Sequence, residues 1–566
     1  MRLVLRNYLS SLKEDGELDK ICVEMLEDLG LTVHASAQKG TRQYGVDVLA
    51  HGRLPGCDED KVYALIIKCE NIDRGEFDKE KTGVAASIKE CLNVYAQNLL
   101  PFECQTLPLV VCIVCGGEIK FDVRADLSAL TTREFSWYRN RHGYKLECEE
   151  WTGDKLASML VNSLQNSNLL VNGDKRLLFR ALALADASQE SFRAFREFVD
   201  RILDFSRVSR KALRLKALRE VNLALAMLIH ECEHQDVRNL DAAWMSSEYV
   251  YLREWEYVQR CNCEKCFDKK FDSSIEDAAR MYCKVGEAYI DRVSIFARER
   301  YGFTLAVDGN DELDVILRFY DVLGRVASFG MYVLESDGRF CSRDGKPVDE
   351  ARFSEMRSKV LDLLTNLLTG NSVAATPILD SHSFAITLCL KFLCLNGAKK
   401  FAGDWMEILV AGIGVLFGQG YGYPVTGLGY KDLLEHLHGS IDGRGVEELV
   451  KASELIPALA LAAIKMNRDD IYDNVCKLAM SLSHKINYQA WFFDEDGEKS
   501  FYCGHNLRGS QLCSLSIENK EDLVGIIKAE AQASPVRLSC IGTLHSGLLY
   551  IGCRHHGFPL PGNLLV

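Results

Sequence analysis

The stretch that most constrains the fold of this chain covers residues 107–115, with the sequence LPLVVCIVC. It is almost wholly apolar and rich in β-branched residues, and Gly116-Gly117 ends it. A strand of this kind, covered on both faces, is typical of a parallel sheet between helical layers. The sequence therefore predicts an α/β domain around this strand.

Further elements are predicted on both sides of this strand. Residues 18–29 carry apolar side chains at helical spacing, and Gly30 follows as the expected stop. The order of elements, α-β-β-β-α-β-β-α, predicts a three-layer α/β domain over residues 1–165. The other predicted elements are strands at 31–33, 46–50, 62–70 and 144–150, and helices at 81–99 and 155–164.

Charged residues stand where these elements meet. Asp47 lies at the start of the second predicted strand, Lys68 lies near the end of the third, and the first helix carries Asp19 and Glu24. Carboxylates hold a hard divalent cation through oxygen, while a lysine orients the attacking water or stabilises charge on a phosphate. The pattern favours a metal-dependent phosphodiesterase that uses Mg2+ or Mn2+, with Asp47 as the central ligand.

Four short motifs carry a family resemblance over the first 165 residues and not beyond. With these motifs the region resembles the restriction-endonuclease-like (PD-(D/E)xK) superfamily, in particular its Mrr-like branch. The resemblance implies a Mg2+-dependent DNA endonuclease, an effector of bacterial restriction or anti-phage defence that acts as a homo-oligomer or with a partner defence protein. The motifs are Leu18-Asp19 with Leu26-x-x-Leu29-Gly30, Gly45-Val46-Asp47, Ile67-Lys68, and Glu150-Trp151-x-Gly153-Asp154-x-Leu156.

One position departs from the family pattern. The family usually carries Glu, Asp or Gln two residues before the lysine, and here that residue is Ile66. Glu70 is one replacement ligand, because strand alternation would place it on the same face as Lys68. Asp19 or Glu24 is another. The alternatives are a nuclease fold that has lost catalysis and serves as a DNA-binding or assembly module, and no relation at all, with Lys68 a solvated strand end.

Contacts with DNA are expected from two places. Arg42 and Gln43 precede Asp47 and are expected to touch the DNA backbone. A basic cluster in a chain of net charge -13 is a second candidate for following phosphates. Its alternative is a solvated helix face that pairs with neighbouring acids. The cluster comprises Arg193, Arg196, Arg201, Arg207, Arg210, Lys211, Arg214, Lys216 and Arg219.

Two further motifs suggest zinc. His230-Glu231-Cys232-Glu233-His234 fits the HExxH pattern of zinc peptidases, with a third ligand from Glu248, Glu254 or Glu256. Glu233 stands where such helices keep uncharged residues. Cys261, Cys263 and Cys266 place three thiols close together, which suits a structural zinc. No fourth ligand stands at the usual spacing, so the favoured alternative is free cysteines in a charged loop.

The rest of the chain is predicted to be a mostly α-helical sensor or scaffold over residues 175–485 and a small α+β part over 486–566, with strands at 488–493, 535–540 and 548–553. The 21 scattered cysteines, and an N-terminus without a long apolar core, predict free thiols in the cytoplasm. The longest apolar run, 406–417, is shorter than the roughly 20 residues that a membrane helix needs. We therefore expect a buried helix and no membrane contact.

Overall fold

The structure is a computed structural model that describes residues 2–36, 43–142, 145–161, 175–206, 211–234, 240–263, 269–303, 312–340, 350–419, 424–437, 449–482, 486–494, 497–504 and 509–565. The chain forms two compact units. The first comprises Met1–Ser246 and Glu264–Asp277, and the second comprises Ser247–Cys263 and Ala278–Val566. The division falls within two long helices, α11 (Leu240–Cys263) and α12 (Lys269–Ala297).

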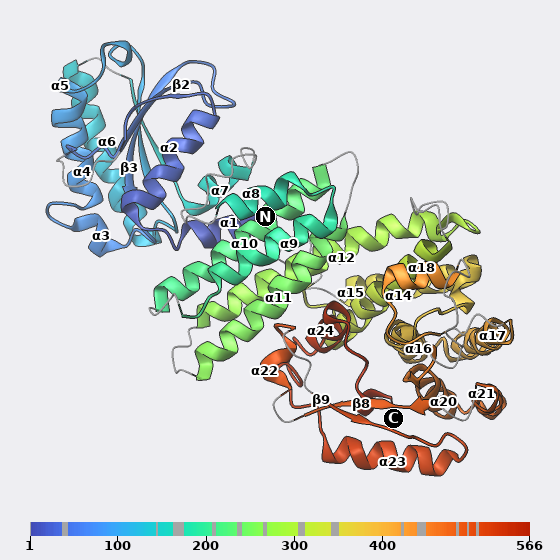
Figure 1. Cartoon of the computed structure of the whole chain (residues 1–566). Coiled ribbons are helices and arrows are strands. Elements are labelled where there is room, and N and C mark those ends of the chain that lie inside the picture. Colours follow the sequence, from blue (N-terminus) through green and yellow to red (C-terminus); the bar gives the residue numbers. More distant parts are fainter. Residues whose placement is uncertain are drawn as a thin grey trace. The chain divides into compact units, whose positions relative to one another are not determined.

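A five-stranded mixed sheet lies at the centre of the N-terminal part of the first unit (Figure 1). The strands follow one another in chain order across the sheet. The first three pair antiparallel, whereas the third, fourth and fifth pair parallel. They are β1 (Thr32–Ala35), β2 (Val48–Gly52), β3 (Lys61–Lys68), β4 (Leu109–Cys115) and β5 (Leu146–Trp151).

Helices cover both faces of this sheet, so the predicted three-layer α/β arrangement is present (Figure 1). On one face lies α2 (Asp19–Asp28), preceded by a π-helical turn, Glu14–Leu18. On the other face, strand residues such as Ile66 and Ile113 form a buried cluster with Ile88 and Leu127 from the helices. The helices of that layer are α3 (Arg74–Asp78), α4 (Val84–Glu90), the π-helical turn Cys91–Tyr95, α5 (Ala96–Asn98) and α6 (Phe121–His142).

Three helices of the first unit were not predicted, and the shortest of them is α3. Two others bear on the fold. One is α6, which joins β4 to β5 and allows them to run parallel, because parallel neighbours need a crossover of a dozen or more residues. The other is α1 (Arg2–Leu9), which packs against α7 (Gly153–Val161). The backbone of α1 comes so close to β4 that a Cβ on Gly116 would lie 2.3 Å from the carbonyl oxygen of Leu9.

The first unit continues beyond the predicted boundary at residue 165 as a set of helices. These are α8 (Lys175–Ala183), α9 (Ser188–Ile202) and α10 (Lys211–His234). Side chains of α10 reach the N-terminal segment: Lys216 pairs with Glu17 at 2.5 Å, and Arg219 donates to the Ser10 hydroxyl at 3.2 Å. The compact unit therefore extends past the α/β layers into helices that we had assigned to the next domain.

The second unit is mostly helical, as predicted. Its α14 (Glu312–Glu335) is buried along most of its length and contacts α15 (Glu350–Gly370), α16 (Ser383–Leu395) and α24 (Leu548–His556). The remaining elements are α17 (Lys399–Gly418), α18 (Tyr430–Leu437), α20 (Leu455–Met466), α21 (Asp469–Ser481), α22 (Glu498–Phe501), α23 (Lys520–Ala533), and two strand pairs, β6 (Ala452–Ser453) with β7 (Asn487–Tyr488) and β8 (Ala490–Phe493) with β9 (Gly509–Leu512).

The predictions for the C-terminal part were correct at one strand and wrong at two. Residues 490–493 form β8 as expected. Residues 535–540 are irregular, and residues 548–553 form the first two turns of α24 instead of a strand. All six residues 548–553 are buried, so the run has no polar side to reveal a helical period, and short apolar runs of this kind fit either element.

Among the described residues, α17 is the one helix long and apolar enough to cross a membrane by length and composition. It is longer than the apolar run we identified in the sequence. It contacts α16, α20 and α21 within its unit, while Ile408 and Val415 remain more than half exposed.

Candidate active site

The Gly45-Val46-Asp47 motif forms a tight turn that leads into β2. Tyr44 and Gly45 both have positive φ, at 51° and 80°. A Cβ on Gly45 would lie 2.2 Å from the Ser87 carbonyl oxygen, so only glycine fits this position. Val46 is buried in the core beside it, which fixes where the next residue, Asp47, leaves the turn.

Asp47 is held against β3 by its backbone and its carboxylate. Its backbone nitrogen donates to the Leu65 carbonyl at 2.9 Å, and its Oδ2 accepts from the Ile67 backbone nitrogen at 2.7 Å. Ile67 immediately precedes Lys68 in the chain. The predicted strand acid and the segment that carries the predicted lysine are therefore joined by hydrogen bonds.

Lys68 ends β3 and is almost fully buried, with 5% of its surface exposed. Its Nζ lies 3.0 Å from Oε1 of Glu14, in the turn before α2. The hypothesis of a solvated strand end is therefore wrong. Glu14 is a residue that our sequence reasoning missed, because it stands before the amphipathic helix in a turn without apolar periodicity.

Asp19 begins α2 and is also buried, with 7% of its surface exposed. Burial, and then the charges of Asp19 and Asp47, raise the pKa of the Cys22 thiol well above its usual value. Both carboxylates thus lie close enough to Cys22 to act on the same thiol. Asp19 is thus linked to Asp47 through the thiol that both charges affect.

Neither Ile66, at the family's usual ligand position, nor Glu70, the suggested replacement, lies beside Asp47 and Lys68. Ile66 is fully buried in the apolar cluster under α4 and α6. The strand ends at Lys68, and Glu70 is exposed with a positive φ of 49°, so the alternation that would place it beside Lys68 does not extend to it. Burial raises the pKa of the Cys69 thiol, and the charges of Glu14 and Glu70 raise it further, so both acids lie near that thiol.

The oxygen donors here suit a hard cation such as Mg2+ or Mn2+ in type, because they are carboxylates. Their spacing is looser than a three-carboxylate site requires. Within the described side chains, no three of these acids bring ligand oxygens within 4.8 Å of one another. The candidate ligands are therefore Asp47 with Asp19, while Lys68 and Glu14 form an ion pair beside them.

The DNA contacts predicted in the loop before Asp47 are only partly described. Arg42 lies outside the described residues. The Gln43 amide donates to the Ser36 carbonyl at 3.1 Å, so its side chain joins the two ends of the loop.

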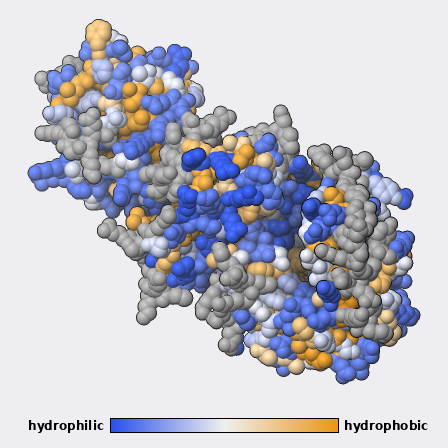
Figure 2. Space-filling model, viewed as in Figure 1, coloured by the Kyte–Doolittle hydropathy of each residue, from blue (hydrophilic) through white to orange (hydrophobic). Residues whose placement is uncertain are grey.

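Three residues of the predicted basic cluster, Arg196, Arg201 and Lys216, pair with acids of the same unit. Arg201 pairs with Glu197, and Lys216 pairs with Glu17. Figure 2 shows hydrophilic side chains over much of this region, and these ion pairs mean that both signs of charge contribute. The alternative of a helix face paired with acids fits this geometry better than a phosphate-following surface.

The prediction that Arg214 contacts DNA is wrong, because this residue is buried. Its side chain is 5% exposed, and its guanidinium lies 3.9 Å from the centre of the Phe205 ring. A guanidinium stacked and buried in this way does not present a surface for phosphate. Arg207 and Arg210 lie outside the described residues, and Lys211 begins α10.

The HExxH motif lies in the last turns of α10, with His230 and His234 both in the helix. The side chain of His234 lies outside the described residues. Two of the three predicted third ligands have other partners: Glu248 pairs with Arg554, and Glu256 pairs with Arg253. These ion pairs argue against either acid as a zinc ligand.

The predicted thiol cluster begins in the last turn of α11. Cys261 is buried and lies in the helix together with Cys263, so these two are not in a loop as expected. The side chain of Cys263 lies outside the described residues. Cys266 lies outside the described residues.

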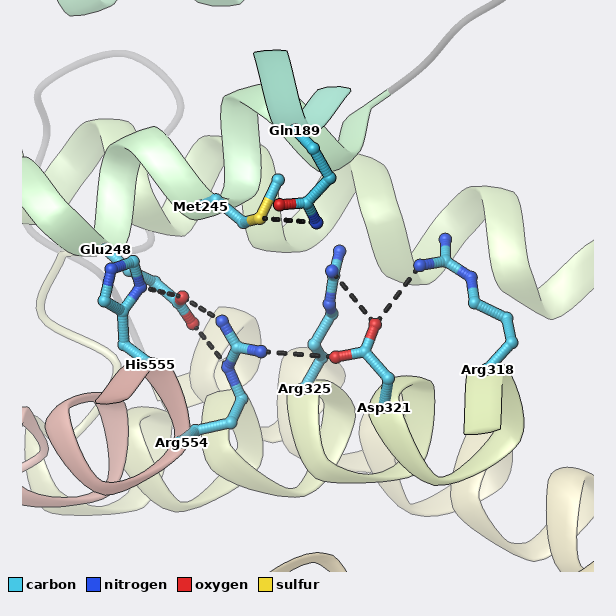
Figure 3. Close-up of polar contacts among 8 residues, drawn as sticks. All are labelled: Gln189, Met245, Glu248, Arg318, Asp321, Arg325, Arg554 and His555. Atoms are coloured by element: carbon cyan, nitrogen blue, oxygen red, sulfur yellow. Dashed lines mark hydrogen bonds and ion pairs between the residues drawn. The ribbon is translucent and has the colours of Figure 1, made fainter. Parts of the chain in front are cut away.

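A network of buried charges lies in the second unit, between α11, α14 and α24 (Figure 3). Arg554 donates from Nε to Glu248 at 2.8 Å and pairs with Asp321 at 3.4 Å, and His555 lies 3.0 Å from the same glutamate. Burial favours the neutral form of Glu248, but the Arg554 and His555 charges outweigh it and lower its pKa to about 2. Glu248 is therefore ionised at neutral pH and held in an ion pair with Arg554.

A cavity of about 260 Å³ lies beside this network and is lined in part by Tyr320, His382, Glu454 and Arg554. Burial lowers the pKa of His382 to about 3, so its ring is neutral. This ring stacks on the Tyr320 ring, with 4.2 Å between the ring centres. Burial and the charge of Asp380 raise the pKa of Glu454 to about 7. This cavity was not predicted from the sequence, because its residues come from distant segments.

Comparison with known proteins gives no family: no family model, no curated protein and no solved structure matches this chain.

Proposed function

We propose that the N-terminal α/β part of this chain is a phosphodiesterase that hydrolyses DNA with a divalent cation, Mg2+ or Mn2+. The observation that carries this proposal is the hydrogen bond of the Asp47 carboxylate to Ile67, directly before the buried and ion-paired Lys68. A carboxylate directly before β2 and an amine at the end of the neighbouring β3 suit a cation and a phosphate.

The residues take separate roles in this proposal. Asp47 binds the cation, and the backbone bond from Ile67 fixes the direction of its carboxylate. Asp19 is the second candidate ligand. Lys68 stabilises negative charge on the phosphate, and Glu14 positions its ammonium. When bound, the cation would activate the attacking water.

The wider setting is proposed from the family resemblance alone. It makes the chain an effector of bacterial restriction or anti-phage defence, with the helical second unit sensing a trigger or binding a partner protein. A second candidate function is a nuclease fold that has lost catalysis and binds DNA or serves in assembly. The spacing of the acids favours this second candidate, because the described side chains do not bring three carboxylates together.

Nicking of a supercoiled plasmid by the full chain in Mg2+ or Mn2+ tests the proposal. Asp47→Ala and Lys68→Ala are each expected to slow nicking at least about 100-fold, the size of effect seen when a charge-stabilising donor is removed. Asp58→Ala and Lys89→Ala, on exposed residues of the same unit, are the matched controls and keep the activity.

Equal cleavage by the wild type and the two site variants would reject the assignment of these residues. DNA binding without cleavage by the wild type, measured by gel shift, would favour the binding module.

A further inference from the structure

Three side chains with metal-binding atoms come together at the edge of the first unit's sheet. They are His34 from β1, His51 from β2 and Cys104 from the short 3-10 helix Phe102–Cys104. Their ligand atoms all lie within 4.8 Å of one another. Within the described part of the chain they are the one group of three or more His, Cys, Asp or Glu residues that meets this distance.

The fold places these three residues by different means. The register of the β1–β2 pair shifts between Val33 and Ala35, so His34 is the extra residue of a β-bulge. Bulges re-aim a side chain, and here the His34 ring stacks on His51 with 4.7 Å between the ring centres. Cys104 is fully buried beneath the sheet edge, while the two histidines are half-buried.

We infer that His34, His51 and Cys104 form a binding site for a borderline transition-metal cation, with Zn2+ as the type. Two imidazole nitrogens and a thiolate are the donors that such ions prefer over Mg2+. Three protein ligands leave the fourth tetrahedral position to water or another group. Binding displaces the Cys104 thiol proton to solvent.

The distances fit an ion after a small movement. Nε2 of His34 lies 2.6 Å from Nδ1 of His51, where a hydrogen bond joins the two rings. Zinc–nitrogen bonds of about 2.0–2.1 Å in a tetrahedron hold the nitrogens roughly 3.3 Å apart, so this pair would open by roughly 0.7 Å. Neither histidine is fully buried, so the surrounding side chains do not enclose the pair completely.

This site is separate from the proposed phosphodiesterase centre. His51 lies in β2, four residues after Asp47, which at the rise of a strand is roughly 13 Å away. Its nitrogen and sulfur donors also select a different class of ion. A bound ion would join the edge strand β1 to β2 and to the segment that precedes β4, so its role is to fasten this side of the sheet.

Cobalt titration of the full chain, freed of metal with a chelator, tests the inference. Co2+ bound to two imidazoles and a thiolate gives visible absorption and a thiolate-to-cobalt charge-transfer band. The band is expected in the wild type and absent in Cys104→Ser. Loss of a residue that only supports a metal ligand weakens binding about 10- to 100-fold. His34→Gln and His51→Gln each remove a ligand, so each is expected to weaken cobalt binding by more than this.

Two controls assign the band to this site. Cys513→Ser changes an exposed thiol, and Cys266→Ser breaks the C-x-C-x-x-C pattern; both are expected to keep the band. If Cys104→Ser fails to fold, the two histidine variants decide the matter, since both side chains are half-buried. Absence of the band in the wild type, its retention at unchanged affinity in both histidine variants, or its loss in Cys266→Ser would overturn the inference.

Discussion

Lys68 shows how one buried charge depends on a residue far away in the sequence. A buried ammonium is costly unless it is paired and hydrogen-bonded, and Glu14 supplies that partner from the turn before α2. The Lys68 side chain is 7% exposed and that of Glu14 is 33% exposed, so the buried lysine is held from its partly exposed partner. A fixed ammonium of this kind suits the stabilisation of a phosphate without reorganisation.

The Glu248–Arg554 pair supports a stability prediction for the second unit. Removing one partner of a buried pair typically costs about 3–5 kcal/mol, because the other charge is left uncompensated. Glu248→Gln is therefore expected to lower the free energy of unfolding by about that amount in chemical denaturation. Glu435→Gln, which breaks the exposed pair with Lys431, is the control and is expected to cost at most about 1 kcal/mol.

The same pair sets a pH dependence. The folded-state pKa of Glu248 is lowered to about 2 from its ordinary value near 4.5. Its contribution is therefore complete above about pH 4.5 and is lost as pH falls through about 2. The stability of the Glu248→Gln variant should therefore lack this dependence on acid pH. If Glu248→Gln and Glu435→Gln lower the free energy of unfolding equally at neutral pH, the role given to the buried pair is contradicted.

At the residue scale, sequence reasoning placed Asp47 and Lys68 on neighbouring strands. In the structure Lys68 ends β3, and Asp47 stands one residue before β2, where it is bonded to β3. Patterns of apolar residues located both strands, and each charge followed from its place at a strand end. Glu14 was missed because its role depends on a turn with no periodic signal. Glu70 was placed by alternation, which ceases where the strand ends and φ becomes positive.

Among the elements, β3 allows the clearest test of the resemblance to the restriction-endonuclease-like superfamily. Ile66 lies in the apolar cluster beneath α4 and α6, so a carboxylate there would be buried without a partner. Ile66→Glu is expected to lower the free energy of unfolding by about 3 kcal/mol or more, measured by chemical denaturation, and not to restore a ligand. Ile66→Val, a smaller apolar change, is the control at about 0.5–1.5 kcal/mol.

The opposite outcome for β3 is equally clear. If Ile66→Glu is as stable as Ile66→Val and nicks DNA faster than the wild type, Ile66 occupies the family's ligand position, and the packing described for β3 is wrong.

Element prediction failed where packing, and not local pattern, decides the outcome. The helix α6 carries Thr131-Thr132 and many charged residues, yet Val123, Leu127 and Leu130 bury one side of it against the sheet. The predicted strands 107–115 and 144–150 have some thirty residues between them, a length that a crossover helix could fill. No comparable cue separated helix from strand at residues 548–553, where every side chain is buried.

For the whole molecule, the coarse layout was predictable, and the division into compact units was not. The α/β layers and the helical remainder follow from apolar periods. The first unit nevertheless takes in α8 to α10, because α10 packs against α1 and pairs with the N-terminal turn through Lys216 and Glu17, while α8 and α9 pack against α10. Sequence separation gave no sign of that pairing, and the basic residues we assigned to DNA serve partly in these internal contacts.

The central claim is that a cation binds at Asp47 beside Lys68, and anomalous diffraction from crystals soaked in Mn2+ tests it most directly. The account predicts an anomalous peak within about 2.5 Å of an Asp47 carboxylate oxygen in the wild type and its loss in Asp47→Asn. A wild-type crystal with no peak at Asp47, or with a peak there that survives the substitution, would contradict it.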